Sequence, residues 1–129
     1  MNFPKDLKYT ASHEWARIEG GVATVGITDF AQGELGDIVF VELPAAGSKV
    51  SMAKPFGTVE AVKAVSDVYS PVSGEVIAAN EDLKNAPDTV NKDPYGKGWM
   101  VKIKIANPAE ANTLLKPEDY EVLAAKSAH

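Results

Sequence analysis

The sequence predicts a mainly β protein in which short strands form two small stacked sheets or a flattened barrel, with short helices near the C-terminus. Runs of β-branched and aromatic residues end repeatedly at glycine or proline, as is typical of short strands joined by turns. Residues 99–105 alternate apolar side chains with lysine, which indicates a strand with one wet face. An internal echo has an offset of 27 residues: Pro44-x-x-Gly47 recurs as Pro71-x-x-Gly74, with Val41 matching Val68 and Val50 matching Ile77. The echo predicts two similar strand-turn-strand units.

The first expected strands form a hairpin around Gly20-Gly21, because glycine accepts the positive φ that a two-residue turn requires. Further along the chain, apolar runs are separated by turn residues or by short polar breaks. The expected strands cover residues 15–19, 22–27, 38–43, 56–62, 65–69, 76–79 and 99–105.

Helix signals are local. Thr28 is a cap-type residue and Gly36 a stop signal, which predicts one or two helical turns over 28–35. Asn107 and Pro108 begin a C-terminal helical segment, in which Glu110 is expected to complete a capping box. A second short helix is expected from Pro117 to about 125, and residues 80–98 are expected to form a long loop with one helical turn. We therefore expect one domain over 1–129, with its core at about 7–106 and a helical appendage at about 107–126.

Composition limits the function. The 129 residues are 45% hydrophobic, enough for one core, and carry a net charge of −5, which argues against nucleic acid and anionic membranes as partners. The absence of cysteine excludes disulfides, thiolate metal sites and cysteine nucleophiles. No apolar run approaches the roughly 20 residues of a membrane span, and the N-terminus lacks signal-peptide or transit-peptide features. We expect a cytoplasmic protein, or a mature form that starts at an introduced methionine.

The segment around Lys63 breaks local rules. If Lys63-Ala64 were the turn of a hairpin, Glu60 would lie opposite Asp67, and like charges directly across a ladder repel. That turn also lacks glycine or asparagine. Such conflicts are expected where function overrides local preference, and an exposed lysine amine is open to acylation. The plainer alternative is that Lys63 is one of 12 surface lysines and that sheet twist separates the two acids.

Several motifs carry a resemblance to a known family. The segment from Glu60 to Asp67 resembles the lipoyl-attachment motif of the glycine cleavage system H proteins, with Lys63 as the modified residue. The likeness extends over about 7–120. Its other motifs, in order, are Ser12-His13-Glu14-Trp15, Val25-Gly26-Ile27-Thr28-Asp29, Gly36-Asp37-Ile38-Val39, Ser70-Pro71-Val72-Ser73-Gly74-Glu75 and Asp93-Pro94-Tyr95-Gly96-x-Gly98-Trp99.

The resemblance implies a hybrid-barrel, lipoyl/biotinyl-domain-like sandwich of two small antiparallel sheets with short C-terminal helices. It further implies lipoate in amide linkage to Lys63, attached by a lipoate ligase or lipoyltransferase. In the family's cycle, the carrier takes an aminomethyl group from glycine decarboxylase (the P-protein) to an aminomethyltransferase (the T-protein). Dihydrolipoamide dehydrogenase (the L-protein) then receives the reducing equivalents. The chain would be a monomeric co-substrate of these enzymes and not a catalyst.

The matched motifs also suggest a cleft for the loaded arm. Glu14 and Asp67 are candidates to hold the aminomethyl ammonium through charge-assisted hydrogen bonds, with Ser12 as a neutral partner. The alternative is an ordinary loop beside a buried Trp15. His13 lacks an identifiable acid or nucleophile partner, so a structural or docking role is expected for it.

The sequence leaves several rival functions open. A biotin carrier typically flanks its lysine with methionine, whereas Val62 and Ala64 stand here. A lipoyl domain of a 2-oxoacid dehydrogenase usually has aspartate where Val62 stands. A relay of lipoyl groups to other complexes could share every motif, and an unmodified interaction module is distinguished by intact mass. A Schiff-base enzyme would need a desolvated lysine, which a hairpin tip does not provide.

Overall fold

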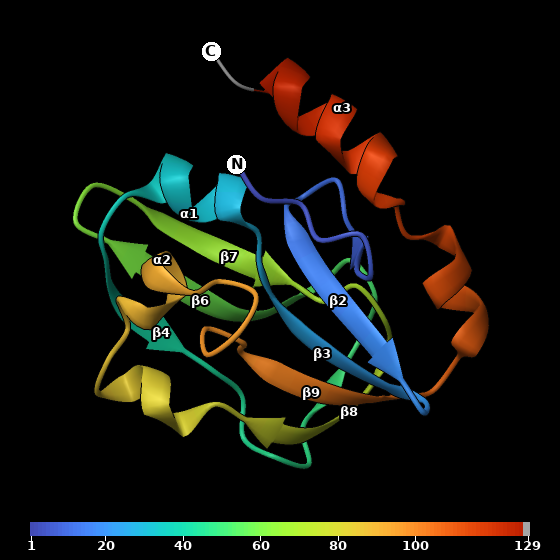
Figure 1. Cartoon of the computed structure of the whole chain (residues 1–129). Coiled ribbons are helices and arrows are strands. Elements are labelled where there is room, and N and C mark those ends of the chain that lie inside the picture. Colours follow the sequence, from blue (N-terminus) through green and yellow to red (C-terminus); the bar gives the residue numbers. More distant parts are fainter. Residues whose placement is uncertain (128–129) are drawn as a thin grey trace.

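The chain folds into two antiparallel sheets, as Figure 1 shows for the computed structural model, which describes residues 1–127. The order in the six-stranded sheet is β1 (Lys8–Tyr9), β2 (Glu14–Glu19), β3 (Val22–Ile27), β9 (Val101–Ile105), β8 (Gly74–Ala79) and β5 (Lys49–Val50). The order in the three-stranded sheet is β4 (Ile38–Glu42), β6 (Pro55–Ala61) and β7 (Val65–Tyr69). The predicted mainly β class with two small sheets is confirmed.

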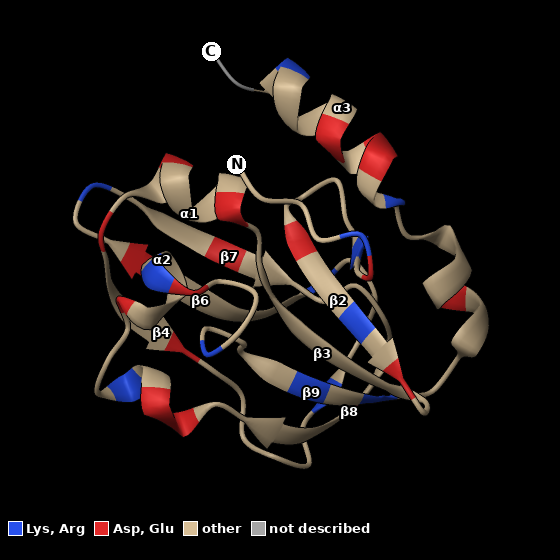
Figure 2. Cartoon of the chain, in the orientation of Figure 1, with Lys and Arg blue, Asp and Glu red and all other residues tan. Residues whose placement is uncertain are grey.

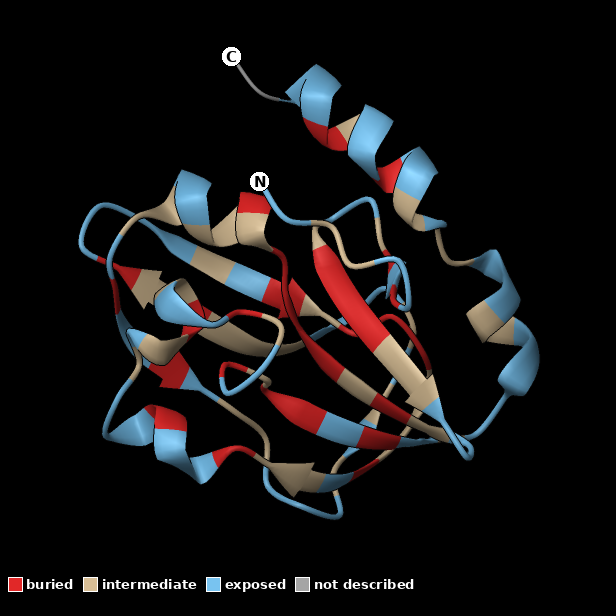
Figure 3. Cartoon of the chain, viewed as in Figure 1, coloured by how far each residue is buried: buried red, intermediate tan, exposed pale blue. Residues whose placement is uncertain are grey.

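The core lies between the sheets. Val25 and Ile103 from the larger sheet and Val59 and Val68 from the smaller sheet are all at least 99% buried. In Figure 3, buried and more exposed segments alternate along β9. The alternation follows from the two-residue period of a strand, which sends every second side chain into the apolar layer.

The sequence echo corresponds to a structural repeat. The β4–β5 and β7–β8 segments each leave the three-stranded sheet and cross into the six-stranded sheet. Val41 and Val68 occupy matching buried positions, as the echo predicts. Ile77 differs from Val50 because a bulge between Val76 and Ala78 leaves Ile77 unpaired and 45% exposed.

Three helices lie in connections between strands: α1 (Asp29–Leu35), η1 (Glu81–Lys84) and α2 (Thr89–Lys92), where η denotes a 3₁₀ helix. Two more follow β9: η2 (Pro108–Thr113) and α3 (Pro117–Ser127). Thr28 caps α1 as expected, by accepting a hydrogen bond from Ala31 N. The long loop expected at 80–98 contains two short helices, η1 and α2, instead of one turn. Across residues 1–127, no helix combines the length and apolar character that a membrane crossing requires.

The capping box expected at the start of η2 is wrong. Asn107 does cap the helix, because its Oδ1 accepts from Ala109 N. Glu110, however, turns to the loop before β8, where its carboxylate accepts hydrogen bonds from N and Oγ of Ser73 at 2.7 and 2.9 Å. A charge-assisted pair of bonds to another segment therefore replaces the local cap.

Tyr120 anchors α3 to the sheet. Its fully buried ring stacks on Tyr9 with centroids 4.6 Å apart and planes 5° apart. Its hydroxyl lies 2.7 Å from Thr28 Oγ1 and 2.9 Å from His13 Nδ1. One side chain thus connects the C-terminal helix, the α1 cap and the loop before β2.

We expect Tyr120→Phe to keep the stacking but lower the free energy of unfolding by about 1–2 kcal/mol, because Thr28 and His13 lose a buried partner. Val122→Ala on the same helix is the control, since Val122 is 55% exposed and its loss should stay within about 0.5 kcal/mol. Urea unfolding of both variants checks this. Equal losses in the two variants would contradict the anchoring role.

Candidate functional site

Lys63 lies on the turn of the β6–β7 hairpin, and the turn differs from the expected one. Glu60 pairs with Val65, and the Ala61 N–H donates to the Ala64 carbonyl at 2.7 Å, so Val62 and Lys63 form the two-residue turn. The expected Lys63-Ala64 turn and the pairing of Glu60 with Asp67 are therefore wrong.

Charge distinguishes this register from the expected one. Both registers point Val59 and Val68 into the core, because they differ by an even step, so the apolar pattern does not discriminate between them. In the observed register Asp67 faces Thr58, which removes the like-charge opposition to Glu60. The charge rule that the expected register broke is thus obeyed, whereas the Val62-Lys63 turn still lacks glycine and asparagine.

The turn presents Lys63 to solvent while holding the backbone in place. The side chains of Val62 and Lys63 are exposed. The Val62 N–H donates to the Asp37 carbonyl at 3.0 Å, which ties the turn to the segment before β4. A β-carbon on Gly36 would lie 3.7 Å from Lys63 Cε, so the lysine stem passes close to the end of α1. In Figure 2 this turn is the blue loop at the left edge of the molecule, beside α1.

Glu14, at the start of β2, is a buried carboxylate with three donors. It is 1% exposed and accepts hydrogen bonds from Thr10 Oγ1 and Ser12 Oγ, both at 2.6 Å, and from Tyr69 N at 3.2 Å. Burial raises the pKa of Glu14 above its ordinary value, although these hydrogen bonds lower it in part. The donors therefore do not fully offset the desolvation of the charged form.

His13 holds the loop that carries Ser12 and Glu14. Its backbone has a φ of 75°, a left-handed conformation that is uncommon for residues other than glycine. The bond between Nδ1 and the Tyr120 hydroxyl and the contact of its ring with Phe30 stabilise that conformation. Burial lowers the pKa of His13, which favours the neutral ring. These contacts agree with the structural alternative of the structural or docking role expected for His13.

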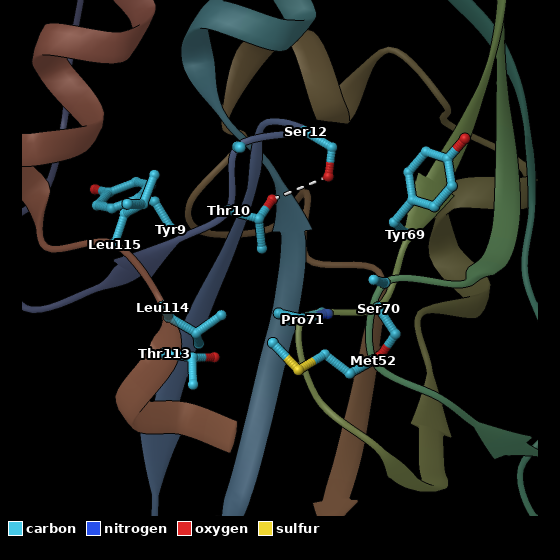
Figure 4. Close-up of a pocket in the computed structure, with 12 residues that line it drawn as sticks. Tyr9, Thr10, Ser12, Met52, Tyr69, Ser70, Pro71, Thr113, Leu114 and Leu115 are labelled. Carbon is cyan, nitrogen blue, oxygen red and sulfur yellow. Dashed lines mark hydrogen bonds between the residues drawn. The ribbon is translucent and has the colours of Figure 1, made fainter. Parts of the chain in front are cut away.

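A cleft of about 460 Å³ opens beside this loop. In Figure 4, Leu114 and Leu115 lie on one side, Tyr69 and Met52 on the other, and Ser12 between them. The walls are largely apolar, and the hydroxyl of Ser12 leads from the cleft to the Glu14 carboxylate. Ser12 also lines a second hollow, of about 370 Å³, together with Leu35 and Ser66 near the lysine turn.

Of the three candidates for the arm cleft, the structure brings two together. Ser12 and Glu14 are hydrogen-bonded. Asp67 is exposed on β7 opposite Thr58, and within residues 1–127 it makes no hydrogen bond to Ser12 or Glu14.

Sequence reasoning missed two donors to Glu14. Thr10 has only one local signal, its position four residues before Glu14. Tyr69 acts through its backbone N–H, which no side-chain pattern could reveal.

Comparison with known proteins places this chain. Residues 7–127 match the family model described as glycine cleavage H-protein. The glycine cleavage system H protein of Carboxydothermus hydrogenoformans is 58% identical over 120 residues, covering 93% of this chain and 92% of that protein. The glycine cleavage system H protein of Rubrobacter xylanophilus is 61% identical over 117 residues, covering 91% of this chain and 90% of that protein.

A solved structure agrees. The crystal structure of a glycine cleavage system H protein from Mycobacterium marinum superimposes with a TM-score of 0.87 at 38% identity, covering 95% of this chain and 98% of that one. This match confirms the expected lipoyl-domain-like sandwich. With the match over nearly the whole sequence, it shows that the chain belongs to the glycine cleavage H-protein family.

Proposed function

We propose that this chain is the lipoyl-bearing carrier of the glycine cleavage system, with lipoate in amide linkage to Nζ of Lys63. The observation that carries the proposal is the exposed lysine on the β6–β7 turn of a chain that belongs to this family. Lipoate, when bound, supplies a dithiolane that accepts an aminomethyl group and two electrons. The partners of the chain are the P-, T- and L-proteins and a lipoate ligase or lipoyltransferase. As a monomer, the chain would bind these enzymes one after another.

The residues present fit this group. A two-residue turn leaves the amine accessible to an acylating enzyme, while the bond from Val62 to Asp37 limits the movement of the backbone beneath it. The chain contains no cysteine, so no thiol of its own would exchange with the dithiolane. The protein would position and tether the lipoyl arm, which raises the local concentration of the carried group at each enzyme.

Glu14 and Ser12 would hold the ammonium of the aminomethyl group. A carboxylate whose pKa is raised by burial gains from a cation placed beside it, because the pair offsets the desolvation that the hydroxyl donors leave uncompensated. The largely apolar walls of the neighbouring cleft would limit the access of water to the carried group. Asp67, exposed on β7, would act as a flanking acid and not through the Glu14 hydrogen bonds.

Mass spectrometry tests the attachment. Protein produced with lipoate and a lipoate ligase should gain one lipoyl increment, located on the peptide that contains Lys63. Lys63→Arg should show none, because its guanidinium is not acylated. Lys54→Arg, in the loop before β6, is the matched control and should still be modified. An unmodified wild-type chain under conditions that lipoylate a known lipoyl domain would remove the acceptor role.

Substitution of Glu14 tests the cleft. In the loaded protein, Glu14→Ala should speed the loss of the aminomethyl group to water, because the ammonium loses its anionic partner. Glu14→Gln, which keeps a hydrogen-bond acceptor for Thr10, Ser12 and Tyr69, should also speed it. Glu75→Gln removes an exposed carboxylate, paired with Lys49, and should leave the rate unchanged. Mass spectrometry measures the rate at which each variant loses the aminomethyl group. Equal rates in wild type and all three variants would contradict the proposed role of Glu14.

The raised pKa of Glu14 also predicts a pH dependence. The folded chain keeps the proton of the Glu14 carboxyl to higher pH than the unfolded chain does. In the pH window above the ordinary pKa of 4.5, the folded state therefore binds more protons than the unfolded state. Glu14 therefore makes the free energy of unfolding fall as pH rises through that window. Relative to Glu14→Gln, the wild type should lose stability from pH 4.5 upward until the folded carboxyl is fully ionised. Urea unfolding at several pH values measures the difference, which would stay constant if the pKa were unshifted.

A further inference from the structure

Exposed apolar side chains gather beside Lys63. The large hydrophobic residues that stand exposed within residues 1–127 are Met1, Val39, Phe40, Val62, Val65, Ile77 and Val122. Four of them, Val39, Phe40, Val62 and Val65, belong to the strand ends and the turn around the lysine, and we call these four the turn patch. The other three are scattered over the N-terminus, β8 and α3.

Strand register explains how the turn patch forms. Phe40 pairs with Glu60 and Glu60 pairs with Val65, so these three side chains form one row across the outer face of the small sheet. A bulge between Ile38 and Phe40 leaves Val39 unpaired, which exposes two apolar residues in succession, Val39 by 54% and Phe40 by 47%. Val62, on the turn itself, is 72% exposed.

The turn patch is not explained by packing within the chain. The neighbouring row, Val41, Val59 and Ser66, points inward, and Val41 and Val59 are buried. Exposed apolar side chains that cluster on one surface usually mark an interaction site. Bulges are enriched where a strand re-aims a side chain for function.

The charge of this face is one-sided. The strands β4, β6 and β7 contain Glu42, Glu60 and Asp67 but neither lysine nor arginine. Asp67, Thr58 and Glu42 form the next outward row below the turn patch. Figure 2 shows acidic segments on these strands, while β9 on the other sheet carries lysines. A partner that covers this face would therefore present an apolar depression edged by basic side chains.

We propose that the turn patch, with Glu42, Glu60 and Asp67 behind it, is the docking surface for the enzyme that acylates Lys63. This inference rests on the proposed lipoylation of Lys63. An enzyme that brings Nζ of Lys63 into its active site must cover the surface around the turn. The exposed apolar side chains there would be removed from water in that complex, which favours binding. The acidic rows direct the basic rim of the enzyme and set its orientation on the sheet.

The double variant Val39→Ser with Phe40→Ser tests this inference. Its matched control is Ile77→Ser with Val122→Ser, because Ile77 and Val122 are 45% and 55% exposed and lie away from the turn. The substrate is the unmodified full chain, and the assay follows lipoylation by a lipoate-protein ligase with lipoate and ATP. The turn-patch variant should lose about tenfold in kcat/KM, mainly through KM, while the control should stay within about twofold of wild type.

Two further measurements complete the test. Thermal unfolding should show both double variants folded, and should the turn-patch variant fail to fold, Val65→Ser, at a 64% exposed position, takes its place. Raising the ionic strength should lower kcat/KM for wild type more than for Glu42→Gln with Asp67→Asn. Equal kcat/KM for the turn-patch variant and its control would overturn the docking inference and leave the proposed function intact. Failure of the wild type itself to be lipoylated would instead remove the proposed function.

Discussion

The apolar layer between the two sheets is the constraint on which the rest of the molecule depends. Val59 and Val68 fix the β6–β7 hairpin in that layer at one end, so the turn beyond Ala61 projects from a rigid base. The same layer leaves no freedom to flip a strand, because a slip of one residue would send its buried side chains to solvent. A mobile arm on Lys63 would therefore start from a fixed point, which limits the entropy lost at each docking event.

If Glu14 holds the carried group as proposed, stability and function conflict near this residue. A buried carboxyl with a raised pKa and a left-handed His13 beside it each cost free energy in the folded chain. The Tyr120 hydroxyl, the Phe30 ring and the hydroxyls of the loop share the task of holding this arrangement. Such local cost is common where a site must be ready for a ligand before the ligand arrives.

Much of this structure could be predicted from the sequence, and the misses have physical causes. The longer strands follow from the alternation of apolar residues, and the Thr28 cap follows from its side chain. The strands β1 and β5, of two residues each, carry too little pattern to be predicted. The register of the β6–β7 turn was not predicted because both registers bury the same side chains. The partner of Glu110 was not predicted because Ser73, distant in the sequence, competes with the local cap. The motifs pointed to Lys63, whereas the contact between Ser12 and Glu14 needed coordinates, as did the backbone donor Tyr69.

The bond from Tyr69 N to Glu14 has a consequence for self-association. β7 is an edge strand of the small sheet, and an edge strand with free N–H groups can pair with the same strand of another copy. Here the Tyr69 N–H is occupied by a carboxylate from a different sheet. A strand that added to this end of β7 would have to displace the Glu14 carboxylate from the Tyr69 N–H, so the same bond that orients the carboxylate also opposes strand addition at this point.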